Sequence, residues 1–506
     1  MENSSSTDFW GPSVVTWFNT APSSALRTHE SPRWYPHKDP ILGLDVLYDL
    51  AMAVFNHRFL EFTAELISRY GGTITYLTLG RQAIYTIDPV NVHAMLTDRT
   101  RYQDFGVGSR KQSLKPLLGS GIFTSDGAIW KHHRSMIRPF LSRVQTAEVD
   151  VFEIHLQTLF QTLPADGSTV DLQRAFNAMT LDISTHLFLG TSTNVLSSLF
   201  HPTSDPSHTR GQQFAAAFDY AQRAISGIDD FGLSGLLWKL VFGDKKLDQS
   251  VETVHSFIDD IIEQQLGLSK LNSNSSNKGQ NFFSDLLKQG RSKEDIKYDV
   301  LNLLLAGKDS NASFLTSVWY VLSQRPDLCA KIREEINTIL HGNPATLEDL
   351  SKFTYLTMVL QEVLRLYPPV AVNQRTAEVD TVLPHGGGAD GESPLRVPRG
   401  ASVGYSVYAM HRLPEYFGDD VDEFRPERWL DIKPKAAYMP FHAGPRTCLG
   451  QHLSMCLAKY STIRILQHYA RVENRNVEPW QEKLGLNCSS RHGALVGLTV
   501  SSSLEA

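Results

Sequence analysis

Cysteine is scarce in this chain. Four cysteines occur among 506 residues, at positions 329, 448, 456 and 488. Four are too few to form a disulfide framework in a protein of this size, so we expect a reducing compartment. The C-x-x-C pairs that are typical of zinc sites are absent. Cys448 and His452, together with His132 and His133, remain the only pattern that could suggest zinc ligands.

Long apolar runs are missing as well. The first ten residues, MENSSSTDFW, have neither the basic start nor the apolar stretch of a secretory signal. The segments FWGPSVVTWFNTA (9–21) and ILGLDVLYDLAMAVF (41–55) are short or interrupted by polar residues. Neither reaches the roughly 20 apolar residues that a membrane-spanning helix needs, so we expect no transmembrane helix. Four early aromatic residues could rest on a membrane surface or make core contacts: Phe9, Trp10, Trp17 and Phe18.

A surplus of basic charge is also absent. The chain has 48 Lys and Arg against 54 Asp and Glu, a formal net charge of -6. This balance gives no support to a nucleic-acid partner, which would need a basic surface. Because no Pro/Gly/Ser-rich boundary divides the sequence, we expect an N-terminal tail at 1–35 and a single domain at 36–506.

The residue patterns predict a mainly α fold with a smaller β part. Residues 70–90 show two alternating β-rich runs around a turn, and residues 370–410 again show strand and glycine-rich turn signals. One long helix is expected from a capping box at Ser292 and Asp295 to Pro326, with a middle that is apolar nearly all round. Another helix is expected from Thr346 to Pro368, and a polar linker at 273–280.

The segment GGGADG satisfies G-x-G-x-x-G through Gly386, Gly388 and Gly391. A dinucleotide site of this kind needs a helix directly after the glycines. The following ESPLRVPRG contains Pro394 and Pro398, which are incompatible with that helix. The segment therefore predicts a glycine-rich hairpin.

The segment FHAGPRTCLG (441–450) holds a lone cysteine, and the usual interpretation of such a residue is a buried structural thiol. Here, however, the segment fits F-x-x-G-x-R-x-C-x-G, which a chain of this length would contain by chance in about one case in ten thousand. That pattern is the signature of the cytochrome P450 superfamily, and the sequence resembles it over about residues 36–500. The resemblance implies the P450 fold, a triangular helical heme-thiolate fold with a long central helix over the heme.

The resemblance implies a heme b group whose iron is bound by the Cys448 thiolate, which donates electron density to the metal. Gly444 and Gly450 would let the backbone approach the heme and the sulfur, and Phe441 would shield the sulfur from water. Covalent c-type heme is excluded because C-x-x-C-H is absent. Further heme contacts are carried over from the family's motifs: Arg446, Trp130 and Arg134 in WKHHR, Arg375 in NQRTA, and Ala306.

Two further matches follow. Glu362 and Arg365 in EVLR, with Arg428 in FRPERW, resemble the superfamily's buried Glu-Arg-Arg network, a structural feature. The segment AGKDSN (306–311) resembles the oxygen-activating segment of the central helix, which implies catalytic roles for Asp309, Ser310 and Asn311. In the family's pattern two residues with hydroxyl groups follow the acid, the first of them Thr; here Ser310 keeps that hydroxyl but loses the methyl group that fixes its rotamer, and Asn311 replaces the second. We therefore expect more oxygen to be reduced without product formation.

Several segments narrow the resemblance to fungal alkane and fatty-acid hydroxylases, among them PHKDPILGLD, YSVYAMHR and the glycine-rich insertion. This implies a monooxygenase that uses O2 as co-substrate and takes electrons from NADPH through a separate NADPH-cytochrome P450 reductase. Its substrate would be hydrophobic: a fatty acid or alkane, or a fungal natural-product intermediate. The alternatives are a heme-thiolate rearrangement enzyme that needs no reductase, and a non-catalytic heme protein. Substrate contacts are expected at Ile122, Phe123, Leu303, Val370, Ala371, Val372, Leu484 and Leu486.

By resemblance, the enzyme would be associated with the cytosolic side of the endoplasmic reticulum membrane. Because relatives usually begin with a membrane anchor and none is visible here, a cytosolic location is the alternative. Lys131, His132, His133 and Arg138 form either a basic docking surface for the reductase or a solvated helix face.

Overall fold

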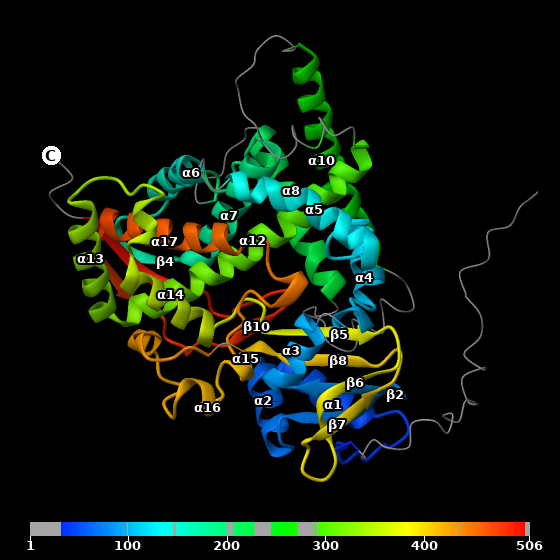
Figure 1. The fold of residues 1–506 in the computed structure, drawn as a ribbon. Coiled ribbons are helices and arrows are strands. Elements are labelled where there is room, and N and C mark those ends of the chain that lie inside the picture. Colours follow the sequence, from blue (N-terminus) through cyan, green and yellow to red (C-terminus); the bar gives the residue numbers. More distant parts are fainter. Residues whose placement is uncertain are drawn as a thin grey trace, which may run out of the picture.

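The computed structural model describes residues 32–500 except 99, 145–147, 200–205, 227–243, 272–285, 287–290 and 435. The expected linker at 273–280 and the aromatic residues at 9–18 lie outside the described residues. The described part is mainly helical with a smaller β part, as the residue patterns predict (Figure 1). None of its helices is both long and apolar enough to cross a membrane.

The helices begin with a pair near the start of the described chain and end with the helix that follows Cys448. Their bounds are α1 Leu44–Phe55, α2 Phe59–Arg69, α3 Pro89–Thr97, α4 Arg110–Leu118, α5 Gly127–Val144, α6 Glu148–Thr162, α7 Leu172–Leu189, α8 Pro206–Ser226, α10 Lys245–Leu271, α12 Lys293–Gln324, α13 Pro326–Leu340, α14 Thr354–Leu366, α15 Val407–Met410, α16 Pro414–Phe417 and α17 Gln451–His468. Short 3-10 helices are η1 Tyr102–Asp104, η2 Asp349–Ser351, η3 Pro426–Leu430 and η4 Gly444–Arg446.

The strands form four small sheets. The largest has the order β1-β2-β8-β5-β3, and the others pair β6 with β7, β10 with β11, and β4-β12-β9. Their bounds are β1 Thr73–Thr78, β2 Arg81–Thr86, β3 Phe105–Gly106, β4 Asp166–Asp171, β5 Val372–Ala377, β6 Thr381–Gly387, β7 Ser393–Val397, β8 Ser402–Ser406, β9 Tyr469–Asn474, β10 Glu482–Leu484, β11 Cys488–Ser490 and β12 Leu495–Val500. The strands at 70–90 and 370–410 agree with the sequence patterns, whereas β3, β4 and β9 to β12 lack an equally clear signal.

The central helix α12 forms where the sequence predicts it. The Ser292 side chain accepts a hydrogen bond from the Asp295 N–H, which caps the helix, and the helix ends at Gln324, two residues before Pro326. The helix packs along α7, and a Cβ placed on Gly307 would come within 2.9 Å of Ser184 Oγ. Glycine at this position therefore allows the close approach of the two helices.

Two sequence predictions need correction. The helix expected from Thr346 begins only at Thr354, because the capping pair of Thr346 and Asp349 closes a single 3-10 turn. Residues 32–35, expected in the tail, join the β part. The Tyr35 N–H donates to the Thr75 carbonyl at 2.8 Å, and the Thr75 N–H donates to the Arg33 carbonyl at 2.9 Å.

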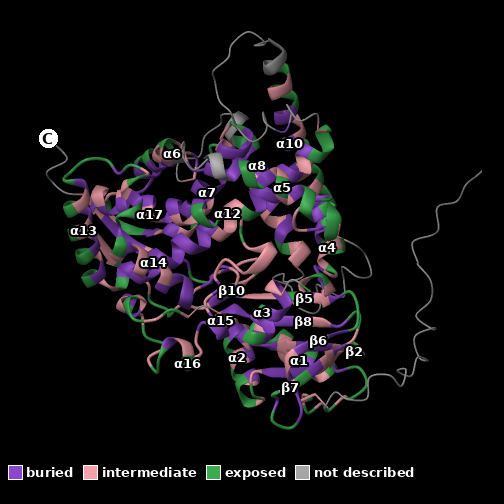
Figure 2. Cartoon of the chain, viewed as in Figure 1, coloured by how far each residue is buried: buried purple, intermediate pink, exposed green. Residues whose placement is uncertain are grey.

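The glycine-rich segment forms the turn between β6 and β7, in which Gly387 pairs with Ser393. A strand rather than a helix follows the glycines, so this segment lacks the helix N-terminus that a dinucleotide pyrophosphate needs. Apolar side chains form a large core in the helical part and a smaller one beside the five-stranded sheet. Figure 2 shows the buried residues concentrated along α7, α12 and α17.

Candidate active site

The cysteine loop is a tight turn that leads into α17. The Cys448 N–H donates to the Phe441 carbonyl at 3.0 Å, and the Thr447 N–H donates to the Gly444 carbonyl at 3.0 Å. Gly444 has a φ of 70°, and a Cβ there would lie 2.0 Å from the Leu96 carbonyl oxygen. Both the backbone angle and the contact with α3 therefore require glycine. At Gly450 the space is less restricted, since a Cβ would lie 3.9 Å from Cys448 Sγ.

Cys448 lies just before the N-terminus of α17, where the sequence predicts it. Its side chain is solvent-accessible although protein atoms surround it densely. Burial raises the pKa of this thiol above its ordinary value, while the Gly450 N–H and the Arg134 guanidinium act in the opposite sense. The thiolate therefore needs a further positive charge, which a bound metal ion would supply.

A second solvent-accessible stretch lies along α12. Residues 299–305 and 311–323 are buried, yet Ala306 between them is exposed, and Asp309 and Ser310 are partly exposed. The Ser310 hydroxyl donates to the Ala306 carbonyl at 2.6 Å, and its oxygen can still accept a hydrogen bond. The Asp309 carboxylate contacts Lys308 Nζ at 2.6 Å. Residues 306–310, the acid–hydroxyl turn, therefore offer an acid and a hydroxyl on an accessible stretch of an otherwise buried helix.

Asn311 is expected to be catalytic, but its side chain makes hydrogen bonds within the protein at both ends. Its amide nitrogen donates to the Gly307 carbonyl at 2.8 Å, and its amide oxygen accepts from Ser454 Oγ at 2.6 Å. Both ends of the buried side chain are thus engaged. Because Ser454 lies in α17, the amide joins the central helix to the helix that follows Cys448. Asn311 positions these two elements relative to each other.

Two arginines near the cysteine loop lie close to the Trp130 ring. The Arg446 guanidinium lies 4.4 Å from the centre of the Trp130 ring, and that of Arg134 lies 5.7 Å from it. Arg134 donates to the Thr447 carbonyl at 3.0 Å, and Arg446 forms an ion pair with Asp126. Burial lowers the pKa of Arg446 to about 10 although Asp126 opposes the shift.

Two further arginines, Arg110 and Arg375, lie around the side chain of Asn373. Its amide oxygen accepts from Arg110 at 2.7 Å and from Arg375 at 3.3 Å, while its amide nitrogen lies 2.9 Å from His442 Nε2. Burial and the two arginines lower the pKa of His442 to about 3, so the ring is neutral and carries its proton on Nδ1. That buried Nδ1, like the Tyr405 hydroxyl, has no hydrogen-bond partner.

These groups fit a ligand that carries carboxylates. The four arginines, at 110, 134, 375 and 446, interact electrostatically, and Asp126 is the one carboxylate that forms an ion pair with them among the described residues. Arg375 is buried and the other three arginines are partly buried. An excess of cations over anions in such surroundings is costly, and an unpaired buried donor such as His442 Nδ1 adds to that cost. Heme propionates would balance the excess positive charge and accept a hydrogen bond from His442 Nδ1. The sequence motifs missed Arg110 and His442, because no pattern marks them.

Glu362, Arg365 and Arg428 meet as the resemblance implies, and all three are fully buried. Glu362 accepts two hydrogen bonds from Arg365, at 2.8 and 2.9 Å, and one from Arg428 at 2.8 Å. Arg365 also donates to the His411 carbonyl, and His411 Nε2 accepts from the Met439 N–H at 3.0 Å. Since Met439 precedes the cysteine loop by two residues, this chain of hydrogen bonds connects the buried network to that loop.

The expected substrate contacts fall into two apolar groups around α12. Ala371, Val372 and Leu484 pack in one small cluster with Cys488, whose N–H donates to the Pro369 carbonyl at 2.7 Å. The others belong to the large core: Ile122, Phe123, Leu303 and Leu486. Val370 is partly buried beside the first group. Two polar residues of α12 that the sequence did not single out anchor these segments: Asn302 accepts from the Phe123 N–H, and Ser313 donates to the Cys488 carbonyl.

The candidate zinc ligands have other partners. His133 Nδ1 contacts Asp299 at 2.7 Å, His132 Nε2 contacts Arg291, and His452 contacts Cys456. Because His133 is buried, it lies outside any docking surface that Lys131 and Arg138 form. No cluster of metal-binding side chains is present in the part of the chain that the structure describes.

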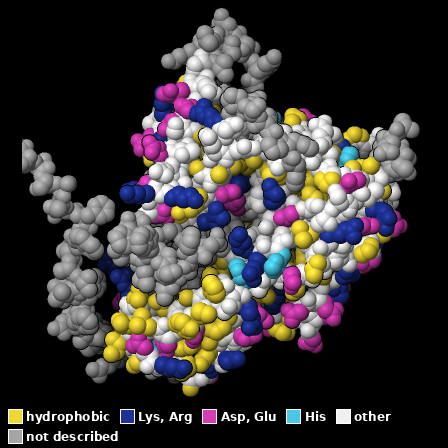
Figure 3. Space-filling view, turned by 180° about the vertical axis from the view of Figure 1, so that it is seen from behind, with side chains coloured by type: hydrophobic (Ala, Val, Ile, Leu, Met, Phe, Trp, Pro, Cys, Tyr) yellow, Lys and Arg dark blue, Asp and Glu magenta, His cyan; other side chains and the backbone are white. Residues whose placement is uncertain are grey.

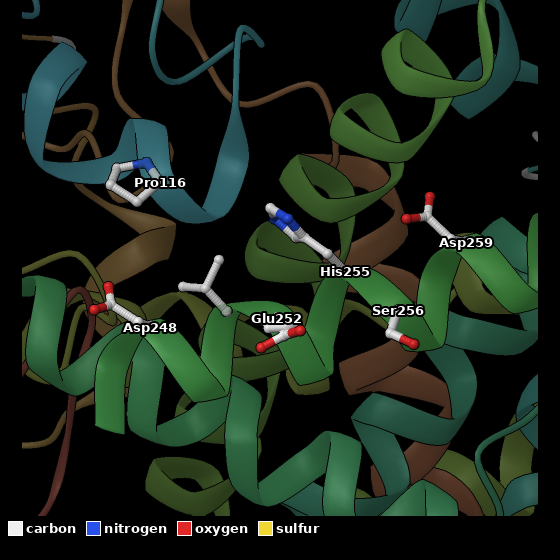
Figure 4. Close-up of a pocket in the computed structure, with 7 residues that line it drawn as sticks. Pro116, Asp248, Glu252, His255, Ser256 and Asp259 are labelled. Carbon is white, nitrogen blue, oxygen red and sulfur yellow. The ribbon is translucent and has the colours of Figure 1, made fainter. Parts of the chain in front are cut away.

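A surface pocket of about 540 Å³ lies between α4 and α10, lined by Pro116, Asp248, Val251, Glu252, His255, Ser256 and Asp259. Figure 4 shows its carboxylates on α10 and Pro116 on the facing helix. His255 Nε2 bonds to the Leu117 carbonyl at 2.9 Å. None of the residues around Cys448 lines this pocket.

Comparison with known proteins identifies the family. The cytochrome P450 family model matches residues 40–491. The chain belongs to the cytochrome P450 family. This P450 is 36% identical over 475 residues to cytochrome P450 monooxygenase himC of Aspergillus japonicus, covering 92% of this chain and 83% of that protein.

Two other fungal relatives have a similar sequence identity to this chain. Cytochrome P450 monooxygenase fsdH of Fusarium heterosporum is 34% identical over 93% of this chain and 82% of its own length. Cytochrome P450 52A13 of Debaryomyces hansenii is 36% identical over 93% and 91%. The P450 fold, use of heme iron and O2, and monooxygenase class that the sequence predicts are thereby confirmed.

Proposed function

We propose that this P450 inserts one oxygen atom of O2 into a C–H bond of a hydrophobic substrate, a fatty acid or alkane or a fungal natural-product intermediate. The overall reaction is RH + O2 + NADPH + H+ giving ROH + H2O + NADP+. NADPH-cytochrome P450 reductase supplies the two electrons, and the single domain expected at 36–506 also includes residues 32–35. The observation that carries the proposal is Cys448 at an accessible site that Ser454 and Asn311 connect to the acid–hydroxyl turn of α12.

Heme, when bound, supplies an iron centre that binds and activates O2. Cys448 would bind its iron, and Trp130, Arg134, Arg375 and Arg446 would hold its edge, with Arg110 and His442 completing the propionate site. Phe441 screens the sulfur from water, and Gly450 provides an N–H that tempers the thiolate charge.

Asp309 and Ser310 would deliver the protons that the reaction consumes. Asp309 is partly exposed and can exchange protons with water. The Ser310 oxygen, whose hydroxyl proton is donated to the Ala306 carbonyl, can accept a hydrogen bond from a water molecule and hold it in the accessible stretch of the helix. The small side chain of Ala306 leaves room there for O2.

The test is oxygen consumption with purified P450 and reductase. Uptake that requires both NADPH and substrate, with product in proportion, supports monooxygenation. A rearrangement enzyme would instead convert its substrate without NADPH or reductase. A panel of fatty acids, alkanes and terpenoid or polyketide intermediates, followed by the heme spin-state shift, identifies the substrate class.

Replacement of Ser310 with threonine is expected to improve the use of oxygen. The added methyl group restricts rotation about the bond that orients the hydroxyl, which should stay on the Ala306 carbonyl. We expect peroxide released per NADPH consumed to fall by about twofold to fivefold. The measurement is peroxide and NADPH in one assay, and an unchanged or higher ratio would contradict the role of Ser310.

Peripheral contact with the cytosolic side of the endoplasmic reticulum membrane is supported by an apolar stripe on α1. The exposed positions of this helix recur every three or four residues and are all apolar: Leu44, Leu47, Tyr48, Ala51, Met52 and Phe55. Its two aspartates are engaged by other side chains, Asp45 with His37 at 2.9 Å and Asp49 with the Tyr35 hydroxyl at 3.0 Å. Ile41, Leu42 and Leu79 extend the exposed apolar surface, and Figure 3 shows hydrophobic side chains gathered low on that side of the molecule.

A double variant, Leu47→Glu with Phe55→Glu, is expected to weaken binding to neutral phospholipid vesicles. Each substitution removes about 2 kcal/mol of apolar burial, so the partition coefficient should fall at least tenfold. Sedimentation with vesicles measures it. Ile154→Glu is the control, because it changes a side chain on α6 whose exposure lies between those of Leu47 and Phe55. Equal vesicle binding by the double variant and the control would rule out α1 as the contact surface.

A further inference from the structure

A buried lysine lies inside the acid–hydroxyl turn. Lys308 is only 3% exposed, and it is the one lysine that is buried among the residues the structure describes. Burial alone would lower the pKa of its ammonium group, but Asp309 and Asp219 outweigh that effect and raise it. Lys308 therefore carries its positive charge in the protein interior.

This ammonium group contacts two carboxylates from different helices. Lys308 Nζ lies 2.6 Å from Asp309 Oδ1 and forms a second, closer ion pair with Asp219. Asp219 lies in α8, which packs against α10 and α4. One cation therefore joins the acid of the central helix to an element 89 residues earlier in the chain.

The two carboxylates share one ammonium group. Each is attracted by Lys308, and each draws the ammonium away from the other. Without Asp219, the whole attraction of Lys308 would fall on Asp309. The α12 backbone offers little freedom to relieve this, because Gly307 packs closely against Ser184 and Phe188 of α7.

We propose that Lys308 is a positioning residue for Asp309, and that Asp219 determines from α8 how firmly Lys308 holds that carboxylate while it passes protons on. This inference rests on the proposed function, since it concerns proton delivery during monooxygenation. A carboxylate bound more tightly to an ammonium group takes up a proton less readily. When proton delivery is slow, O2 and NADPH are spent on peroxide, by O2 + NADPH + H+ giving H2O2 + NADP+.

The key variant is Asp219→Asn. Asp219 is 47% exposed, so the change leaves no buried charge unpaired while Asp309 still compensates Lys308. We expect the peroxide released per NADPH consumed to rise roughly threefold to tenfold, with a larger solvent isotope effect on product formation. The heme content and the reduced carbon monoxide spectrum should stay as in the wild type.

A matched control lies on the same helix. Lys297 of α12 forms an ion pair with Asp259 of α10 at 3.0 Å, and Asp259 is 46% exposed. Asp259→Asn removes a comparable interhelical pair away from the acid–hydroxyl turn, so its peroxide ratio and isotope effect should equal those of the wild type. If Lys308 only clamped helices together, both variants would lower thermal stability and neither would change the ratio.

A double variant tests the route of the effect. In a Lys308→Met background, Asp219→Asn should produce no further change in the peroxide ratio, while Lys308→Arg should retain most of the wild-type behaviour. A wild-type ratio in Asp219→Asn, or the same increase with and without Lys308, would overturn the inference. Either result leaves monooxygenation intact, because wild-type product formation in the same assay tests the proposed function separately.

Discussion

Replacing Cys448 with serine is expected to abolish monooxygenase activity, with a loss of at least about a thousandfold, or 4 kcal/mol in transition-state stabilisation. The hydroxyl is a far poorer donor to iron than a thiolate. The neighbouring cationic residues would remain, so part of the heme should still bind through its propionates. The measurement is the reduced carbon monoxide spectrum together with NADPH-dependent product formation.

Two further variants serve as comparisons for this prediction. Cys448→His should give the spectrum of an imidazole-ligated heme. Cys329→Ser changes a partly buried thiol that donates a hydrogen bond to the Leu322 carbonyl, so it should keep the wild-type spectrum. If the wild type and Cys448→His gave the same globin-like spectrum, Cys448 would not be the iron ligand.

Replacing Glu362 with glutamine is expected to destabilise the protein by about 3 to 5 kcal/mol. Glu362 accepts hydrogen bonds from Arg365, Arg428, the Arg425 N–H and the Trp429 indole, so an amide NH2 would face donors on one side. Two fully buried guanidinium groups would also lose their shared anion. Because the network reaches Met439 through His411, we expect heme retention to fall together with stability.

Chemical denaturation followed by circular dichroism, and heme content after gel filtration, measure these two effects. The control is Glu427→Gln, which removes an ion pair between Glu427 and Lys331, both substantially exposed. Exposed pairs of this kind contribute about 0 to 1 kcal/mol, so the control should unfold nearly as the wild type does. Equal losses in the two variants would mean that the buried network does not stabilise the cysteine loop.

Much of the fold could be predicted from local patterns. The capping box at Ser292, the apolar middle of α12, and the two β-rich regions depend on near neighbours in sequence, and all are present. The prediction of a helix start at Thr346 was wrong because its capping pair can stabilise a single turn as well as the first turn of a longer helix. Strands such as β4 and β12 pair over more than 300 residues, so no local pattern marks them.

The sequence alone determined the features that short motifs reveal: a thiol before a helix, a Glu-Arg-Arg set and an acid next to a hydroxyl. The tertiary structure decided which side chains from distant parts of the chain form ion pairs and hydrogen bonds with one another. It joined Lys308 to Asp219, gathered Arg110 and His442 around Asn373, and committed Asn311 to Ser454. Electrostatic and hydrogen-bond energies depend on distance in space, and the residues in these contacts lie between 69 and 263 positions apart in the chain.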